Sequence, residues 1–148
     1  MFLGYQNGKI KFYTEQPLQA EFYDLDKVEE TEFEYVLDGE EYVLKDEAWE
    51  EKQAQKEKER IAMLSLTRGD VFRGLLMAKG VTRAQLRAMI ETNELLSVVE
   101  KEMALIDFDE ALNFYRGNAL IDTVGLALGI TGEQLDKFFE TNDYTTLL

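Results

Sequence analysis

The chain has 148 residues, of which 45% are hydrophobic, so it has enough apolar material for a folded core in one domain or two small ones. It contains no cysteine and no histidine, which excludes disulfides, thiolate nucleophiles and Ser-His-Asp triads and removes the commonest metal ligand. The formal net charge of −14 opposes direct binding to DNA or RNA phosphates.

No apolar run approaches the roughly 18 residues that a membrane-spanning helix requires. The N-terminal segment MFLGYQNGKIKFY lacks the basic start and the apolar stretch of a signal peptide. We therefore expect no membrane contact and a cytoplasmic location, or a place inside whatever particle the protein joins.

Residues 1–46 predict an antiparallel β section that begins with a hairpin. Asn7-Gly8 lies between two alternating segments, and Asn-Gly favours the type I′ turn because both central residues need positive φ. This register pairs Tyr5 with Ile10 and Leu3 with Phe12.

A second hairpin is predicted around Asp38-Gly39. A two-residue loop there pairs three sets of residues: Leu37 with Glu40, Tyr35 with Tyr42, and Phe33 with Leu44. The aromatic and leucine members Phe33, Tyr35, Tyr42 and Leu44 then share a face that covers a core, and Glu32 lies opposite Lys45. We expect both hairpins in one antiparallel sheet, with Phe22-Tyr23 as a further short strand or a connector.

Residues 47–64 predict a connecting helix rich in Ala, Glu, Gln and Lys. Its middle, from residue 50 to residue 60, is polar on every side apart from Ala54, as in a solvated helix that joins two packed units. Trp49 at one end and Ile61, Met63 and Leu64 at the other are the expected anchors. A coiled coil is the alternative, but no apolar seam supports it.

Residues 65–148 predict a five-helix bundle. The first helix follows Thr67 and ends at Gly80, and a second begins at Thr82. We expect a longer helix over 95–115, a shorter one over 120–128 and a last one after Thr131. The expected apolar positions of the first helix are Val71, Phe72, Leu75, Leu76 and Met77.

An internal repeat links residues 80–93 with residues 129–142 at a constant offset of 49, with seven of fourteen positions identical. Both copies read as a helix stop, a corner and a Thr-x-x-Gln capping box that opens the next helix. The repeat is either one good helix corner used twice or a duplicated helical hairpin. The repeat is a poor candidate for a DNA-binding helix-turn-helix motif. The helix that would enter the groove in the second copy carries three acidic residues, Glu133, Asp136 and Glu140, and only one base, Lys137.

The negative charge is concentrated in residues 21–51, which hold fourteen carboxylates and two lysines, a net charge of −12. Such a segment is either a solubilising surface that discourages aggregation or a docking surface for a basic protein. The candidate partner-binding residues are Glu29, Glu30, Glu32, Glu34, Glu40 and Glu41.

Two acidic groups were tested as metal sites: Asp24 with Asp26, and Asp107 with Asp109 and Glu110. Neither fits the twelve-residue calcium loop, and Asp107 and Glu110 read as a solvated or ion-paired face beside Arg116. A pair of carboxylates would suffice for a glycosidase, but no cleft or motif supports one. We therefore expect no catalytic residue, no metal and no cofactor.

The segment KDEAWE at residues 45–50, the helix after it, and the bundle ending in LIDT and LDKFF resemble a group of small phage and prophage proteins over roughly residues 40–148. These are similar to products of tail and host-interaction modules and have no catalytic motif to carry over. The resemblance implies a phage origin, with the protein in the host cytoplasm or associated with the virion.

Together these observations predict an α+β protein with three sections: a β section over 1–46, a connecting helix over 47–64 and a bundle over 65–148. The expected function is non-enzymatic protein–protein binding in a structural or assembly role, with a possible homo-oligomer. The alternative is an acidic nucleic-acid mimic that inhibits a host defence protein.

Overall fold

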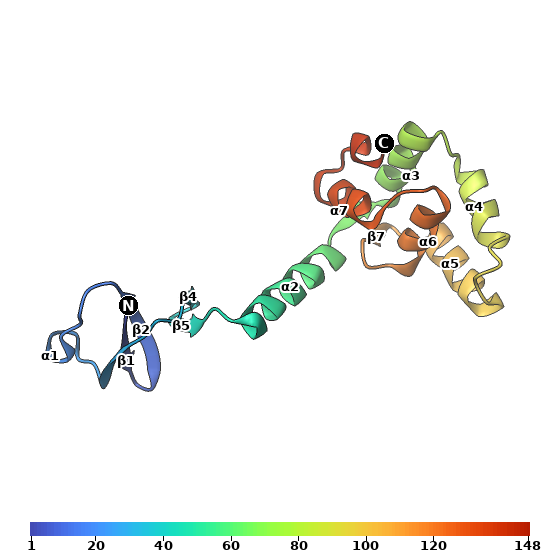
Figure 1. The fold of residues 1–148 in the computed structure, drawn as a ribbon. Coiled ribbons are helices and arrows are strands. Elements are labelled where there is room, and N and C mark those ends of the chain that lie inside the picture. Colours follow the sequence, from blue (N-terminus) through green and yellow to red (C-terminus); the bar gives the residue numbers. More distant parts are fainter. The chain divides into compact units, whose positions relative to one another are not determined.

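The structure is a computed structural model that describes all of residues 1–148. It is α+β, as the sequence predicts, with small antiparallel sheets in the N-terminal part and helices in the C-terminal part (Figure 1). The chain forms two compact units, Met1–Lys56 and Glu57–Leu148, whose boundary falls inside the connecting helix. Each unit has its own set of contacts.

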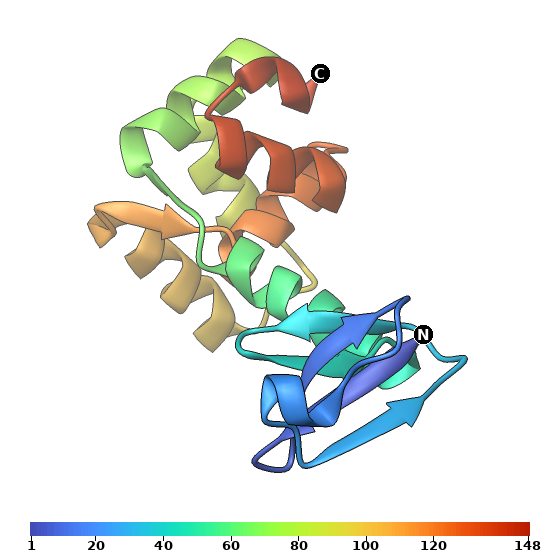
Figure 2. The ribbon, with the colours of Figure 1, turned by 90° about the vertical axis from the view of Figure 1, so that its left-hand side faces the viewer.

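The first unit contains two small sheets and a short helix, visible in blue and cyan in Figure 2. Its elements are β1 (Phe2–Gln6), β2 (Lys9–Thr14), α1 (Ala20–Tyr23), β3 (Lys27–Glu30), β4 (Tyr35–Asp38), β5 (Glu41–Leu44) and the start of α2 (Glu47–Ala62). One sheet has the strand order β2-β1-β3, and β4 and β5 form a separate pair. The expectation of a single sheet is therefore wrong.

Side chains, not a backbone ladder, join the β4–β5 pair to β2. The ring of Tyr13 lies 5.6 Å from that of Tyr35 and 5.9 Å from that of Tyr42, both in tilted geometry. The Tyr13 hydroxyl also donates a hydrogen bond to the Phe33 carbonyl oxygen at 3.2 Å. Aromatic packing of this kind stabilises two sheets against each other without shared strand pairing.

The first hairpin is confirmed, with one change of register. Tyr5 pairs with Ile10 as predicted, but a bulge between Gly4 and Tyr5 places Leu3 opposite Tyr13 instead of Phe12. The extra residue of a bulge increases the local twist of the strand. Leu3 is the one fully buried large side chain of this unit.

Phe22 and Tyr23 lie in the helical turn α1, not in a strand, and the third strand is β3 instead. Asp24 ends α1 in the left-handed region with φ 52°. β3 then pairs antiparallel with β1, with Val28 opposite Gly4.

The second hairpin forms, but its turn lies one residue further along than predicted. Tyr35 pairs with Leu44 and Leu37 with Tyr42, so the two turn residues are Gly39 and Glu40. Gly39 has φ 68°, and a positive φ at the first central position alone is the pattern of a type II′ turn. The shift leaves Phe33 outside the strand, and it places Glu34, not Glu32, beside Lys45.

α2 begins after Asp46, whose carboxylate accepts a hydrogen bond from the Trp49 backbone N–H at 2.9 Å. Its middle is exposed apart from a half-buried Gln53, in agreement with the predicted solvated helix. The helix ends at Ala62, and Met63 is exposed, so Met63 is not the anchor that the sequence suggested. Leu64 does pack against the core of the second unit.

The second unit consists of five α-helices, a two-stranded sheet and a C-terminal 3-10 turn. Its elements are β6 (Ser65–Thr67), α3 (Arg68–Lys79), α4 (Arg83–Glu91), α5 (Val98–Glu110), β7 (Asn113–Tyr115), α6 (Ala119–Ala127), α7 (Gly132–Thr141) and η1 (Tyr144–Leu147). β6 and β7 pair antiparallel, with Leu66 opposite Phe114.

The predicted long helix over 95–115 is wrong at both ends. A capping box of Ser97 and Glu100 starts α5 only at Val98, and the chain leaves the helix after Glu110 to form β7. β7 places Phe114 in the core, where its side chain is fully buried.

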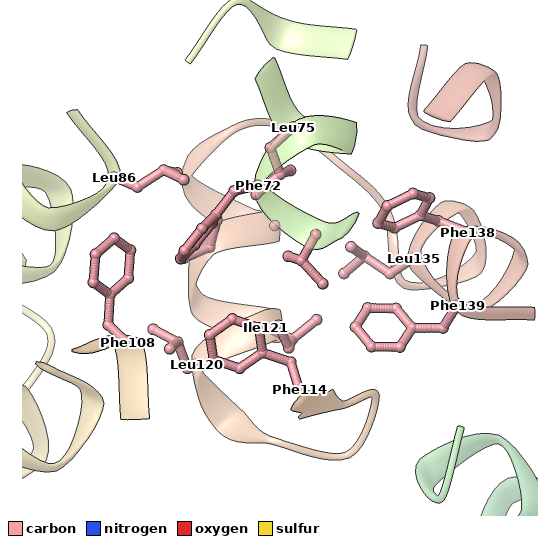
Figure 3. A pocket seen from close by; sticks show the side chains of 13 residues that line it. Phe72, Leu75, Leu86, Phe108, Phe114, Leu120, Ile121, Leu135, Phe138 and Phe139 are labelled. Atoms are coloured by element: carbon pink, nitrogen blue, oxygen red, sulfur yellow. The ribbon is translucent and has the colours of Figure 1, made fainter. Parts of the chain in front are cut away.

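The core of the second unit gathers apolar side chains from all five helices, β7 and η1. Figure 3 shows the side chains that line a small gap in this core, among them Phe114, Leu135 and Phe138. The gap that they enclose measures about 20 Å³ and is lined by apolar groups alone. A space of this size and polarity is a dry packing defect, with too little room for a ligand. Leu76 and Met77 are exposed, contrary to the expectation that they join this core.

Arg116 is the one buried charged residue of the protein. Its guanidinium donates to Asp136 at 2.6 Å and to Asp122 at 2.8 Å, which ties β7 to α6 and α7. It forms no ion pair with Asp107 or Glu110, and α5 ends at Glu110, so these residues do not share a helix face with Arg116 as the sequence suggested.

The two copies of the repeat share the positive-φ glycine and the capping box, but their second helices end differently, at Thr92 with φ −98° and at Asn142 with φ 54°. Gly80 and Gly129 have φ of 67° and 70°, and Thr82 and Thr131 each form a complete capping box with the glutamine three residues on. These predicted caps are confirmed. Whether the two hairpins superpose as a duplicated unit stays a prediction.

Candidate functional site

The six candidate glutamates are spread over three elements of the first unit. Glu29 and Glu30 lie at the end of β3, and Glu40 and Glu41 lie at the turn between β4 and β5. β3 is one edge strand of the three-stranded sheet, and β5 contacts β2, which is the other edge strand, so the two groups lie on different strands. Glu32 and Glu34 lie between them in the β3–β4 connection.

Lysines of the same unit neutralise four of the six carboxylates. The ion pairs are Lys27–Glu29 at 2.8 Å, Lys45–Glu34 at 3.0 Å, Lys9–Glu41 at 3.8 Å and Lys11–Glu40 at 3.9 Å. These pairs are largely exposed, so they contribute little stability and are screened by salt. Glu30 and Glu32 form no ion pair, and they carry the uncompensated charge of the group.

Residues 30–34, which we call the acidic loop, carry an exposed aromatic ring among these charges. The Phe33 side chain is 67% exposed, with Glu32 before it and Glu34 after it. The backbone of Phe33 is held at both polar atoms: its N–H donates to Thr31 Oγ1 at 3.1 Å, and its carbonyl accepts from Tyr13 at 3.2 Å. The ring is therefore presented to solvent from a fixed backbone.

Sequence reasoning assigned Phe33 to the covered face of the hairpin. The alternation of residues 32–37 is typical of a strand, and nothing in it shows that pairing begins only at Tyr35. No local signal separates this pattern from that of a half-buried strand, because an apolar residue between two polar ones is also what a covered face shows.

Hydrogen bonds also tie the acidic loop's neighbour Glu29 to the sheet. The Tyr5 hydroxyl donates to Glu29 Oε2 at 2.8 Å, and this bond raises the pKa of Tyr5 to about 12. The Lys27 ammonium, followed by the Tyr5 hydroxyl, lowers the pKa of the Glu29 carboxyl. Glu29 therefore stabilises the β1–β3 pair and is less available to a partner than Glu30 or Glu32.

Three of the five carboxylates considered as metal ligands have other partners. Asp26 accepts a hydrogen bond from the Asn7 backbone N–H at 2.5 Å, Asp107 accepts one from Asn118, and Asp109 pairs with Arg87. No group of three or more acidic side chains in the structure has the geometry to hold a metal ion. No helix is both long enough and apolar enough to cross a membrane.

Comparison with protein-family models, with curated proteins and with solved structures finds no match to this chain.

Proposed function

We propose that this chain is a non-enzymatic accessory protein of a phage or prophage that acts by binding another protein. The acidic loop of residues 30–34 is the proposed contact, and a basic surface is the proposed partner chemistry. The main support for the proposal is the exposure of Phe33, whose ring is presented on a hydrogen-bonded backbone between Glu32 and Glu34.

An exposed aromatic ring suits a binding anchor because large rigid side chains in a fixed position lose little entropy on binding. The surrounding carboxylates supply the second part of the recognition. The first unit holds fifteen carboxylates and six lysines, a net charge of −9, and five of those lysines are already paired. Such a surface attracts basic partners from a distance and repels acidic ones.

The proposed phage or prophage origin extends the resemblance expected from the sequence over roughly residues 40–148, and the proposed location is the host cytoplasm or the virion. A narrower form of the same function is a nucleic-acid mimic that occupies the phosphate-binding surface of a host defence protein. The net charge of the first unit and the unpaired Glu30 and Glu32 favour that form.

Site-specific crosslinking tests the proposal directly. A photoreactive phenylalanine analogue at Phe33 should capture one basic protein from host cells. The same analogue at Phe22 is the matched control, because Phe22 is also highly exposed on this unit but lies outside the acidic loop. Equal capture from both positions, or capture from neither, would contradict the proposal.

The captured protein then decides between the two forms of the function. If the protein is a nucleic-acid mimic, added DNA should compete with it for the partner, because both occupy the same basic surface. If DNA does not compete, the assembly role is the supported form.

A further inference from the structure

α5 has apolar residues on two opposite sides. One side packs into the core of the second unit through Phe108, Ala104 and Leu105. Val99, Met103 and Ile106 lie on the opposite side and are 67%, 62% and 57% exposed. Their spacing of four and three residues aligns them along one line of the helix, which we call the α5 ridge. A surface helix normally carries one apolar stripe, so the second stripe has no function in the fold.

Two shallow grooves extend this apolar surface over α6. The first, of about 180 Å³, lies beside Met103 and is lined by Leu96, Ala104 and Ala119 among others. The second, of about 360 Å³, is lined by Leu95, Leu96, Leu126 and neighbouring residues. They share Leu96 and Thr123, so ridge and grooves form one continuous surface. Contiguous exposed apolar surface of this kind marks an interaction site in a protein of ordinary composition.

The charges around this surface have one sign. Glu100 and Asp107 are the only charged residues that line either groove. Helical geometry places Glu102 beside the ridge and Glu110 at its end, while Lys101 is on the side that faces the core. Arg87 of α4 forms ion pairs with Asp109 and Glu91. A binding partner with lysine or arginine beside its apolar contacts would therefore complement these carboxylates at the rim of the surface.

We propose that the α5 ridge and its grooves bind an amphipathic helix of another protein, with an apolar stripe flanked by lysine or arginine. An exposed methionine such as Met103 adapts its shape to different apolar side chains, which suits a helix-binding surface. A second copy of this chain fits less well, because a two-fold contact would bring the rims of Glu102 and Glu110 against equivalent carboxylates. This surface lies in the second unit and does not depend on the acidic loop.

The test uses the full chain and a fluorescent synthetic peptide of about 18 residues, or five helical turns, with leucine on one face and lysine elsewhere. Its counterpart replaces each lysine with glutamate. We expect the lysine peptide to bind and the glutamate peptide not to bind. Met103→Gln with Ile106→Gln should weaken binding by at least about tenfold, since it removes the central contacts.

Three variants serve as controls. Met77→Gln changes an equally exposed methionine on α3 and should leave binding unchanged. Glu102→Gln with Glu110→Gln should weaken binding chiefly at low salt, because it removes only charge. Glu30→Gln with Glu32→Gln and Glu34→Gln alters the acidic loop and should leave the peptide affinity intact. All substituted side chains are on the surface, and glutamine is a good helix former, so melting curves should confirm that each variant folds.

Several outcomes would overturn the proposal. One is equal binding of the two peptides, and another is an affinity that the Met103 and Ile106 substitutions do not change. Loss of binding in the acidic-loop variant alone would place the peptide on the first unit, which would refute this inference and leave the proposed function standing. Concentration-dependent dimerisation that the Met103 and Ile106 substitutions abolish would assign the surface to a second copy instead.

Discussion

Gly74 of α3 lies directly against the ring of Phe138 of α7. A Cβ atom at residue 74 would overlap the Cζ and Cε2 atoms of that ring. Phe138 is fully buried, and the gap beside it measures only about 20 Å³, so the ring has little room in which to move. The absence of a side chain at Gly74 therefore sets how closely these two helices approach.

This contact predicts that Gly74→Ala destabilises the protein, although alanine is the better helix former by about 1 kcal/mol. Overpacking of a filled core costs about 1–3 kcal/mol, which exceeds that gain. Denaturant unfolding of Gly74→Ala, Phe138→Leu and the double variant measures the coupling. The double variant should be more stable than the sum of the two single effects, and simple additivity would mean that the ring adjusts freely.

Leu86 and Leu135 occupy the same position of the internal repeat, and both are buried, with 1% and 5% exposure. Leu→Ala at either position should lower the free energy of unfolding by about 2–5 kcal/mol, because each leaves a cavity beside a capped helix start. Chemical unfolding checks the size of both effects. Superposition of residues 68–93 on residues 117–142 checks the duplication itself, and a poor fit would leave only a helix corner used twice.

The bond between Tyr5 and Glu29 predicts a late-titrating tyrosine. The pKa of Tyr5 is raised to about 12, so one of the seven tyrosines should ionise above the others in an absorbance titration. Because folding raises the pKa of the Tyr5 hydroxyl, the hydrogen bond to Glu29 contributes its full stability below about pH 10. That contribution is lost as the pH rises through 12. Glu29→Gln should bring the Tyr5 pKa back toward 10, whereas Glu30→Gln should not.

The opposite sign applies to Glu29. Its pKa is lowered from 4.5, so its contribution is present above that pH and is lost as the pH falls through the lower value of the folded protein. In Glu29→Gln, both the pKa of Tyr5 and the dependence of the unfolding free energy on pH in the acid range should therefore change. A change in neither would mean that the two side chains do not interact in solution.

The second unit should fold on its own from residue 57, not from residue 65. The last turns of α2 belong to it: Arg60 pairs with Glu140 at 2.9 Å, and the Gly117 N–H donates to the Ala62 carbonyl at 3.0 Å. A fragment of residues 57–148 should therefore melt cooperatively, and a fragment of residues 65–148 should be less stable. Differential scanning calorimetry of the two fragments measures this, and equal melting temperatures would show that the end of α2 contributes nothing.

The sequence predicts local features of this protein well and pairing between distant segments poorly. The helix caps at Thr82 and Thr131, the Tyr5–Ile10 pair and the polar α2 all follow from residues close together in the chain. β7 could not be found in this way, because Phe114 is fixed in a strand only by β6, about fifty residues earlier. The capping box of Ser97 and Glu100 was readable, and it would have placed the start of α5 correctly.

The candidate site was predicted in part. Acidic residues were expected on the surface, and Glu29, Glu30, Glu32, Glu34 and Glu40 are exposed while Glu41 is half-buried. Their pairing with lysines and the exposure of Phe33 depend on a turn that forms at Gly39-Glu40 instead of Asp38-Gly39. The predicted turn needs a positive φ at Asp38 as well as at Gly39, whereas the observed turn needs it at Gly39 alone. In the observed turn Tyr35 and Tyr42 also contact Tyr13, and that contact is not visible in the sequence.

We propose that the acidic loop binds a basic protein partner through Phe33 and the charges around it. The most direct measurement is the affinity of the crosslinked partner for wild type, Phe33→Ala and the triple variant Glu30→Gln, Glu32→Gln and Glu34→Gln, at low and at high salt. We predict that Phe33→Ala weakens binding at least about tenfold at both salt concentrations, since it removes an apolar anchor. The triple variant should weaken binding mainly at low salt, where the charges are unscreened. An affinity that neither variant nor salt changes would contradict the account, because the partner would then be bound elsewhere on the chain.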